Sequence, residues 1–122
     1  MFMRCEICGN IVGVIEDNSV TPECCGQNMT LLTPNTVDAA QEKHVPVGVI
    51  NGNKLSVQVG STLHPMIKEH HIAWIAIAQG RRTQRVQLDP TGSPTADFYV
   101  DDSEPITMYE YCNLHGLWAA DM

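Results

Sequence analysis

The residues of this sequence that are suited by type to bind a metal fall into two groups. Five cysteines and five histidines occur in the 122 residues. Four cysteines lie within the first 25 positions, namely Cys5, Cys8, Cys24 and Cys25. The fifth, Cys112, stands near the C-terminus together with His115, and the remaining histidines lie between the two groups at His44, His64, His70 and His71. Thiolate sulfur and imidazole nitrogen are ligands for zinc and iron, so each group is a candidate metal site.

The first group has the spacing Cys5-x2-Cys8-x15-Cys24-Cys25. The pair in "CEICG" is a metal-binding knuckle, because Gly9 frees the backbone for a tight turn. Adjacent cysteines cannot form that turn, but they can supply two sulfurs if the backbone twists, which Gly26 helps. We expect a four-sulfur tetrahedron with a distorted angle. Spacing alone favours zinc slightly over iron, since four thiolates suit both metals. Two disulfides are the alternative, and reducing conditions disfavour them.

The second group predicts a nitrogen-rich metal site. The histidines and Cys112 fall near the ends of strand-like runs, where segments distant in sequence can meet. His70 and His71 project to opposite faces of a strand, so only one of them can join a given site. Periodicity does not choose between the two. Each histidine taken alone is more often a structural or surface residue than a ligand.

The elements that must position these residues are mostly short strands. Residues 1–36 contain few apolar side chains, so a segment of this size needs a staple such as a metal. Residues 31–38, with Pro34 and Asn35, form a connector. Asn51-Gly52 between two β-prone runs predicts a hairpin. No convincing helix is predicted, and the fold class is all-β. We expect seven strands in an immunoglobulin-like β-sandwich over residues 37–122, at 36–42, 43–50, 53–60, 70–79, 82–89, 96–100 and 106–112.

Charge and composition exclude some partners. The net charge is −7, which argues against nucleic acid and anionic membranes as partners. No apolar run approaches the ~20 residues that cross a bilayer. The beginning of the chain lacks the pattern of a secretory signal, so a cytoplasmic protein is expected. Five cysteines in that compartment indicate metal binding or redox chemistry before disulfides.

Several motifs together resemble one family. "EKHVPV", "HPMIKEHHIAWI" and "YCNLHGLW" follow a domain with adjacent cysteines, and this order closely resembles desulfoferrodoxin, the two-iron superoxide reductase. The resemblance spans nearly the whole chain. Residues 1–36 by themselves resemble the small iron protein desulforedoxin, and residues 37–122 resemble the superoxide reductase domain.

The resemblance implies two mononuclear irons per chain. One is held by four sulfurs, from Cys5, Cys8, Cys24 and Cys25. The other is held by four histidine nitrogens and one axial sulfur, from His44, His64, His70, His115 and Cys112. His71 is not a ligand in this pattern. Every ligand position of the family is occupied in this sequence.

The implied activity is one-electron reduction of superoxide to hydrogen peroxide at the second iron, at an open sixth position opposite Cys112. Lys43 resembles the residue that attracts superoxide and orients a proton-donating water. Glu42 resembles the carboxylate that can occupy the sixth position of the oxidised iron. Without the resemblance, both are ordinary solvated charges at the start of a strand. A rubredoxin-like protein or a reductase is implied as electron donor, and a homodimer as the assembly.

Two other classes of function remain compatible with the sequence. One is an electron carrier whose two metals bind no substrate, and consumption of superoxide without oxygen evolution would separate it from a reductase. The other is a zinc-stabilised binding module, which would be colourless and free of iron. No flavin or nicotinamide motif is present, so the electron must come from outside the chain.

Overall fold

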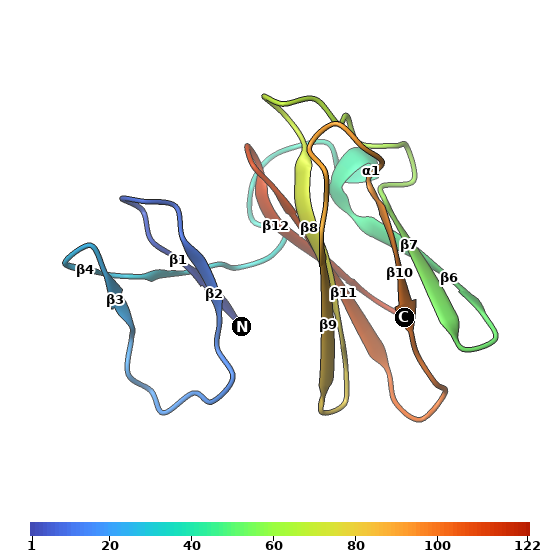
Figure 1. The fold of residues 1–122 in the computed structure, drawn as a ribbon, viewed down its shortest axis with the longest axis horizontal. Helices are drawn as coiled ribbons and strands as arrows, with labels where there is room; N and C mark the ends of the chain where they lie inside the picture. Colours follow the sequence, from blue (N-terminus) through green and yellow to red (C-terminus); the bar gives the residue numbers. More distant parts are fainter. The chain divides into compact units, whose positions relative to one another are not determined.

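The computed structural model describes all residues from Met1 to Met122 and divides them into two compact units. Unit 1 comprises Met1–Thr33, and unit 2 comprises Pro34–Met122. Both are built from strands, as Figure 1 shows. The boundary expected from the sequence lies between residues 36 and 37, and the two compact units of the structure are divided between Thr33 and Pro34.

Unit 1 contains five very short strands. β1 (Phe2–Arg4) lies between β2 (Ile11–Gly13) and β5 (Thr30–Leu31), and β3 (Glu23–Cys24) pairs with β4 (Gln27–Asn28). Its core consists of three buried side chains, Met3, Cys5 and Met29, with Val14 and Cys24 against them. So little apolar area does not stabilise a domain of this size, and a cross-link among the cysteines is required.

Unit 2 is a sandwich of two antiparallel sheets. One sheet has the order β10-β7-β6 and the other the order β12-β11-β8-β9. The strands are β6 (Pro46–Asn51), β7 (Lys54–Val59), β8 (Ile72–Gln79), β9 (Arg82–Gln87), β10 (Thr95–Tyr99), β11 (Ile106–Cys112) and β12 (Gly116–Asp121). The predicted all-β fold, a cysteine-rich unit followed by a β-sandwich, is confirmed.

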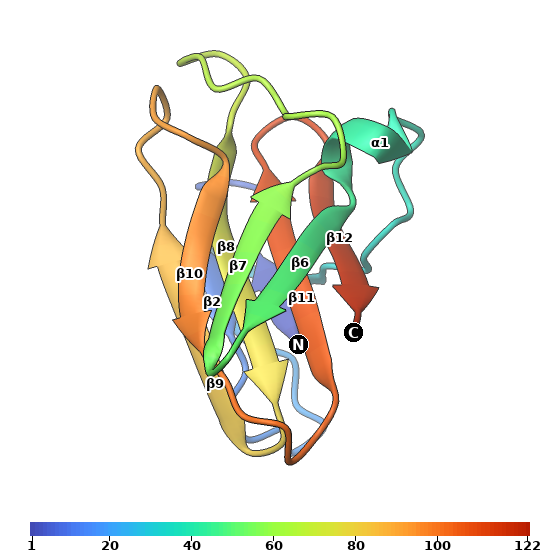
Figure 2. The ribbon, with the colours of Figure 1, turned by 90° about the vertical axis from the view of Figure 1, so that its right-hand side faces the viewer.

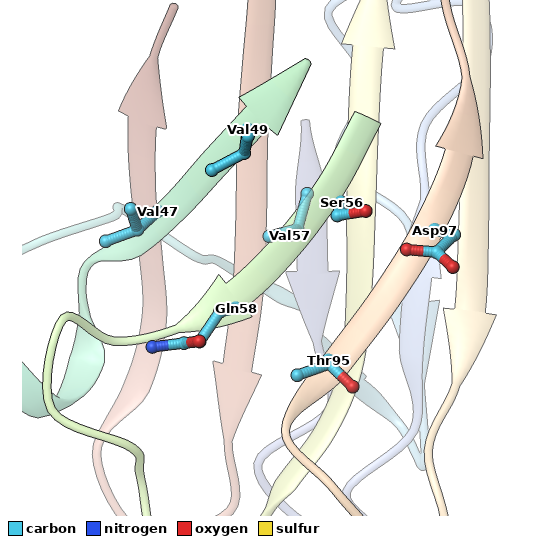
Figure 3. A pocket seen from close by; sticks show the side chains of 7 residues that line it. All are labelled: Val47, Val49, Ser56, Val57, Gln58, Thr95 and Asp97. Atoms are coloured by element: carbon cyan, nitrogen blue, oxygen red, sulfur yellow. The ribbon is translucent and has the colours of Figure 1, made fainter. Parts of the chain in front are cut away.

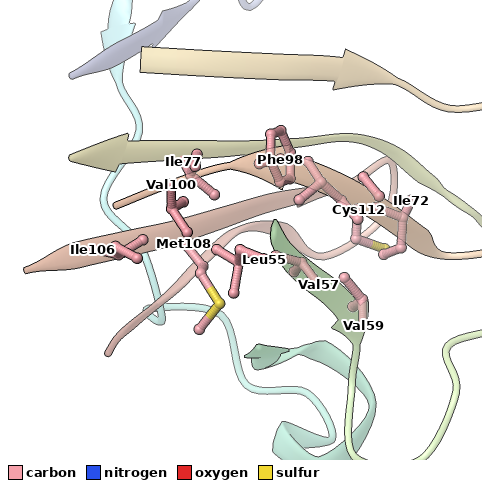
Figure 4. Packing of buried hydrophobic residues seen from close by; sticks show 12 residues of the cluster. Leu55, Val57, Val59, Ile72, Ile77, Phe98, Val100, Ile106, Met108 and Cys112 are labelled. Atoms are coloured by element: carbon pink, nitrogen blue, oxygen red, sulfur yellow. The ribbon is translucent and has the colours of Figure 1, made fainter. Parts of the chain in front are cut away.

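The core of unit 2 follows from alternation along its strands. In β11 every second residue from Ile106 to Cys112 is buried, and in β7 the same holds for Leu55, Val57 and Val59. Side chains that alternate in this way meet between two sheets. Figure 4 shows the resulting cluster, with Cys112 and Ile72 together at one end of it. The thiol of Cys112 therefore lies in a dry, closely packed environment.

The end of the sandwich that holds Cys112 gathers several loops. Figure 2 shows the loop between β7 and β8, the turn between β11 and β12, and the helix α1 (Gln41–His44) all at this end. The turn after β11 depends on Gly116, whose φ of 78° lies in the left-handed region. At the other end, β6 and β7 form the predicted hairpin, with Gly52 at φ 66°.

The strand prediction needs two corrections. Residues 36–42 are not a strand, because they form an irregular connection that leads into α1. The seventh strand is instead β12, which the sequence analysis missed and which pairs with β11 from Asp121 to Gly116. As a result His44 ends a short helix rather than opening a strand, and His70 precedes β8 rather than beginning it. No helix in the structure has the length and apolar character to cross a bilayer.

Candidate metal centres

The four cysteines of unit 1 converge on one point. Their sulfur atoms all lie within 4.8 Å of one another, and none is in a disulfide. The Sγ atom of Cys24 lies 3.6 Å from that of Cys8 and 3.9 Å from that of Cys25. A divalent ion ~2.3 Å from four tetrahedral sulfurs would separate them by about 3.8 Å. The donor set therefore fits a tetrahedral metal.

The backbone of unit 1 adopts unusual conformations to bring adjacent cysteines together. Cys25 has a φ of 55° and Gly26 a φ of 76°, both in the left-handed region. This twist is what allows neighbouring residues to direct both sulfurs to one point. At the first pair, Gly9 has a φ of 81° and its N–H donates to the carbonyl of Cys5 at 2.9 Å. The N–H of Cys8 donates to Cys5 Sγ at 3.4 Å.

Electrostatics in this cluster call for a cation. The backbone N–H of Cys8 lowers the pKa of Cys5 to about 6, so its thiolate forms readily. Hydrogen bonding of the Cys24 thiol to the sulfurs of Cys5 and Cys8 favours its protonated form and raises the pKa of Cys24 to about 12. Four thiolates this close repel one another unless a positive ion lies between them. The chemistry of the cluster is thus that of a metal site.

The second cluster joins three distant segments of unit 2. His44 comes from the end of α1, His64 and His70 from the loop between β7 and β8, and Cys112 and His115 from the end of β11 and the turn after it. The donor atoms of His44, His70, Cys112 and His115 lie within 4.8 Å of one another. His64 closes the set, because its Nε2 lies 3.5 Å from Cys112 Sγ. The structure brings together all five of the side chains assigned to this site.

Hydrogen bonds fix which nitrogen of each ring is free to bind a metal. The Nδ1 of His44 donates to the carbonyl of Ala40, and the Nδ1 of His64 donates to that of Pro65, both at 2.7 Å. Each ring then presents an unprotonated Nε2 to the cluster. His115 instead presents Nδ1, which lies 3.8 Å from Cys112 Sγ. These are the tautomers that a metal site of four imidazoles requires.

Burial keeps the cluster uncharged when no metal is bound. Desolvation lowers the pKa of His64 to about 4 and lowers the pKa values of His44 and His70 as well. Desolvation also raises the pKa of the Cys112 thiol. The Nε2 atom of His70 is buried without a hydrogen-bond partner, which is costly for a polar atom. A bound metal would accept that lone pair and would stabilise the Cys112 thiolate, so the residues fit a metal with nitrogen and sulfur ligands.

Glu42 and Lys43 lie directly beside this cluster. Both are exposed residues of α1, next to the buried His44. Desolvation is the main cause that lowers the pKa values of His44 and His70, and the positive charge of Lys43 adds a smaller contribution to both. The carbonyl of Glu42 accepts a hydrogen bond from the N–H of Thr62 at 2.9 Å, which ties α1 to the loop after β7.

Trp118 forms one wall of the cluster. Its ring stacks on that of His44 with a centroid distance of 5.0 Å, and its Nε1 donates to the carbonyl of His115 at 3.2 Å.

His71, by contrast, lies outside the cluster. Its Nδ1 is 3.0 Å from the carbonyl of Lys68, and this contact directs the ring away from the other histidines.

Two further features lie apart from the donor atoms. Glu110 is fully buried on the inner face of β11, where desolvation raises its pKa to about 9, so this carboxyl is neutral at pH 7. Figure 3 shows a shallow hollow on the outer face of the sheet formed by β10, β7 and β6. Its lining of aliphatic and polar side chains, from Val47 to Asp97, includes none of the cysteines or histidines.

Sequence reasoning missed the groups that hold the ligands in place. The carbonyls of Ala40 and Pro65 orient two rings, yet backbone atoms have no signature in a sequence. The side chain of Asn113 bonds to the backbone on both sides of His70. Its place between Cys112 and His115 was the signal that could have identified it.

Comparisons with known proteins agree with this geometry. The family model described as desulfoferrodoxin matches residues 36–121, and the model described as the N-terminal domain of desulfoferrodoxin matches residues 2–32. A desulfoferrodoxin from Syntrophotalea carbinolica is 45% identical over 118 residues, which cover 97% of this chain and 93% of that protein. A superoxide reductase from Pyrococcus horikoshii is 38% identical over 95 residues, which cover 63% of this chain and 83% of that protein.

Solved structures show the same similarity. The superoxide reductase from Treponema pallidum superposes with a TM-score of 0.79 at 32% identity, covering 97% of this chain and 98% of that one. The one-iron superoxide reductase from Giardia intestinalis superposes with a TM-score of 0.59 at 33% identity, covering 66% of this chain and 97% of that one. The resemblance drawn from the sequence motifs is confirmed.

Proposed function

This chain belongs to the desulfoferrodoxin family, and we propose that it is a superoxide reductase, an oxidoreductase that converts superoxide to hydrogen peroxide with one electron and two protons. The observation that carries the proposal is the convergence of four imidazoles and one thiol in unit 2. Relatives named superoxide reductase support it.

Two mononuclear irons are the cofactors in this proposal. Cys5, Cys8, Cys24 and Cys25 hold the first. His44, His64, His70 and His115 hold the second through nitrogen, and Cys112 holds it through sulfur. With only five donors from the chain, such an iron would be able to take a small anion as a further ligand. Histidine and cysteine together suit iron, whereas carboxylate-rich sites suit harder metals.

When bound, the second iron supplies the electron for superoxide by passing from the ferrous to the ferric state. Four neutral imidazoles and one thiolate leave the ferrous site with a net positive charge, which favours an anionic substrate. The Cys112 thiolate would donate electron density to a bound iron and would favour its oxidised state. The packed core around Cys112 excludes water from the sulfur.

Lys43 and Glu42 act around this centre in the proposed reaction. The Lys43 ammonium group attracts superoxide to the site and orients a water that donates a proton. Its exposed position on α1, beside His44, suits both tasks. Glu42 is the carboxylate that would bind the iron in its oxidised state. The nearby charge of Lys43 outweighs the distant net charge of −7, since exposed charges beyond ~10 Å are screened at ordinary salt.

The proposal extends to the partners and setting of the enzyme. Electrons come from a rubredoxin-like protein or a reductase, so the chain takes part in electron transport, and the four-sulfur iron either relays these electrons or only stabilises unit 1. The enzyme forms a homodimer and works in the cytoplasm, where thiols remain reduced and available to metals. The sandwich is of immunoglobulin-like type, which the grouping of β6, β7 and β10 against the other strands supports.

Metal analysis with visible spectroscopy tests the proposal on protein purified without added metal. We expect two irons per chain and absorption from thiolate-to-iron charge transfer at each centre. A colourless protein that contains zinc and no iron would support a zinc-stabilised binding module instead.

A further inference from the structure

We propose that Asn113 is a positioning residue that fixes the backbone of His70 and thereby holds this imidazole at the iron. The inference rests on the proposed function, because it assigns His70 as an iron ligand. It concerns how the site is held together and not which substrate the site takes.

Asn113 bonds to the peptide groups on both sides of His70. Its Oδ1 accepts from the N–H of His71 at 2.9 Å, and its Nδ2 donates to the carbonyl of Glu69 at 3.0 Å. Its own backbone N–H donates to the carbonyl of His71 at 3.2 Å. Three hydrogen bonds therefore join one residue to the segment that carries the ligand.

His70 depends on its backbone more than the other ligands do. The Nδ1 atoms of His44 and His64 are each hydrogen-bonded to a carbonyl, which fixes the planes of these rings. Trp118 holds His115 through its carbonyl. The Nε2 of His70 has no hydrogen-bond partner, and its ring meets those of His64 and His115 edge-on and that of His44 at a centroid distance of 6.4 Å. The direction of this ring is thus set by the position of the peptide units around it.

The three hydrogen bonds of Asn113, which we call the Asn113 clamp, also link the donors of the site to one another. Asn113 directly follows Cys112 and stands two positions before His115, so its three bonds tie the segment with two donors to the segment with a third. Between Ile67 and His70 the loop is closed by only two further backbone hydrogen bonds, at 3.0 and 3.1 Å. Without Asn113, the loop and the turn after β11 would lose both side-chain hydrogen bonds that Asn113 makes between them.

An asparagine side chain suits this task because it is both donor and acceptor. Aspartate retains the acceptor for the N–H of His71, but its second oxygen would face the carbonyl of Glu69 and repel it. Alanine removes both side-chain bonds. The effect on the site is therefore expected to be largest for Asn113→Ala and intermediate for Asn113→Asp.

The chain offers a matched control for these substitutions. The side-chain amide of Gln84 also bonds to both groups of one peptide segment, donating to the carbonyl of Tyr99 at 2.6 Å and accepting from its N–H at 3.3 Å. Gln84 belongs to β9 and Tyr99 to β10, and none of the metal-binding side chains belongs to these strands. Gln84→Ala thus removes the same kind of clamp without touching a ligand.

The test measures iron loss from the iron-loaded, full-length protein to a ferrous chelator, with ⁵⁷Fe Mössbauer spectra before and after. Removing outer partners of a ligand typically costs 10- to 100-fold in metal affinity. We expect Asn113→Ala to release iron from the histidine site about 10- to 100-fold faster than wild type. Its Mössbauer parameters should change at that site, while the four-sulfur iron remains unchanged. Asn113→Asp should release iron at an intermediate rate, and Gln84→Ala at the wild-type rate.

Two results would overturn the inference. One is wild-type iron release and an unchanged spectrum in both Asn113 variants. The other is equal acceleration in Gln84→Ala, which would mean that any lost clamp loosens the protein. If Asn113→Ala does not fold, the comparison of Asn113→Asp with Gln84→Ala decides in the same way. This test uses no superoxide and therefore does not depend on the activity of the protein. A wild-type protein that holds iron but does not consume superoxide would contradict the proposed function and leave the role of Asn113 unaffected.

Discussion

The Nε2 atom of His44 and the Nδ1 atom of His115 lie 3.1 Å apart, although 71 positions separate the two residues. Two nitrogens bound ~2.1 Å from one ion at a right angle would lie about 3.0 Å apart. The two rings meet edge to face, at 87°, so their lone pairs converge on a shared point. This pair of nitrogens already has the spacing of neighbouring ligands around one metal.

Replacing Lys43 should slow the capture of superoxide. We expect Lys43→Ala to lower the second-order rate constant about tenfold at low salt, because the cation steers an anion to the site. The dependence of the rate on salt should weaken as well. Pulse radiolysis at several ionic strengths measures both. Lys54→Ala is the control, since Lys54 of β7 pairs with Asp97 of β10 and neither strand carries a donor of the site. Wild-type capture by Lys43→Ala at low salt would refute the assigned role.

Gly60 should be needed to place α1. A Cβ atom at Gly60 would lie 2.5 Å from the carbonyl oxygen of Glu42, inside van der Waals contact with backbone. Gly60→Ala is therefore expected to destabilise unit 2 by about 1–3 kcal/mol, the usual cost of overpacking. It should also slow superoxide capture, because Glu42 and Lys43 are displaced. Denaturant unfolding and pulse radiolysis measure the two effects. Gly92→Ala, in an exposed turn, should change neither, and a Gly60→Ala protein with wild-type values would contradict the account.

The metal-free protein should lose stability in mild acid. Burial lowers the pKa of His64 to about 4, whereas the unfolded chain takes up a proton near pH 6.5. Between pH 6.5 and 4 the unfolded chain therefore binds more protons than the folded chain, and the free energy of unfolding decreases as the pH falls. We expect His64 to contribute a loss of about 1–3 kcal/mol. Urea unfolding of the apoprotein at pH 7.0 and 4.5 measures the loss, and equal stability at both values would show that His64 is not desolvated.

Cys25→Ser should separate the two centres. We expect it to remove iron from the four-sulfur site while the histidine site retains its iron, since every donor of the second centre lies within Pro34–Met122. Iron content and a single reaction with superoxide measure this. Loss of both irons would be the opposite result. Steady-state turnover of the same variant with an electron donor then shows whether the four-sulfur iron relays electrons or only stabilises unit 1. Turnover should slow only if that iron relays electrons.

Much of the fold could be predicted because β7 alternates apolar and polar residues and β8 is an almost continuous apolar run, which are both strand signals. Residues 36–42 were wrongly predicted as a strand, although only Thr36 and Val37 are β-branched. They form an irregular connection held partly by Asn35, whose side chain bonds to the N–H and the carbonyl of Ala119. β12 was missed because its small residues, Ala119 and Ala120, carry little strand signal. Its pairing with β11 is a tertiary effect.

The candidate site could be located from motifs but not from periodicity. Spacing alone left His70 and His71 equivalent, and the family pattern chose His70. The structure gives the physical reason, because His71 turns its Nδ1 to the carbonyls of Ile67 and Lys68 whereas His70 faces the cluster. That choice is made by the loop and by Asn113, and it depends on backbone contacts that no sequence pattern displays.

The most direct measurement of the central claim is the product balance of the reduced, iron-loaded protein with a limiting amount of superoxide. A reductase oxidises one histidine-site iron for each superoxide consumed, forms one hydrogen peroxide and evolves no oxygen. Oxygen equal to half of the superoxide would identify a dismutase. Superoxide that persists while both irons stay reduced would show that the centre is not a catalyst.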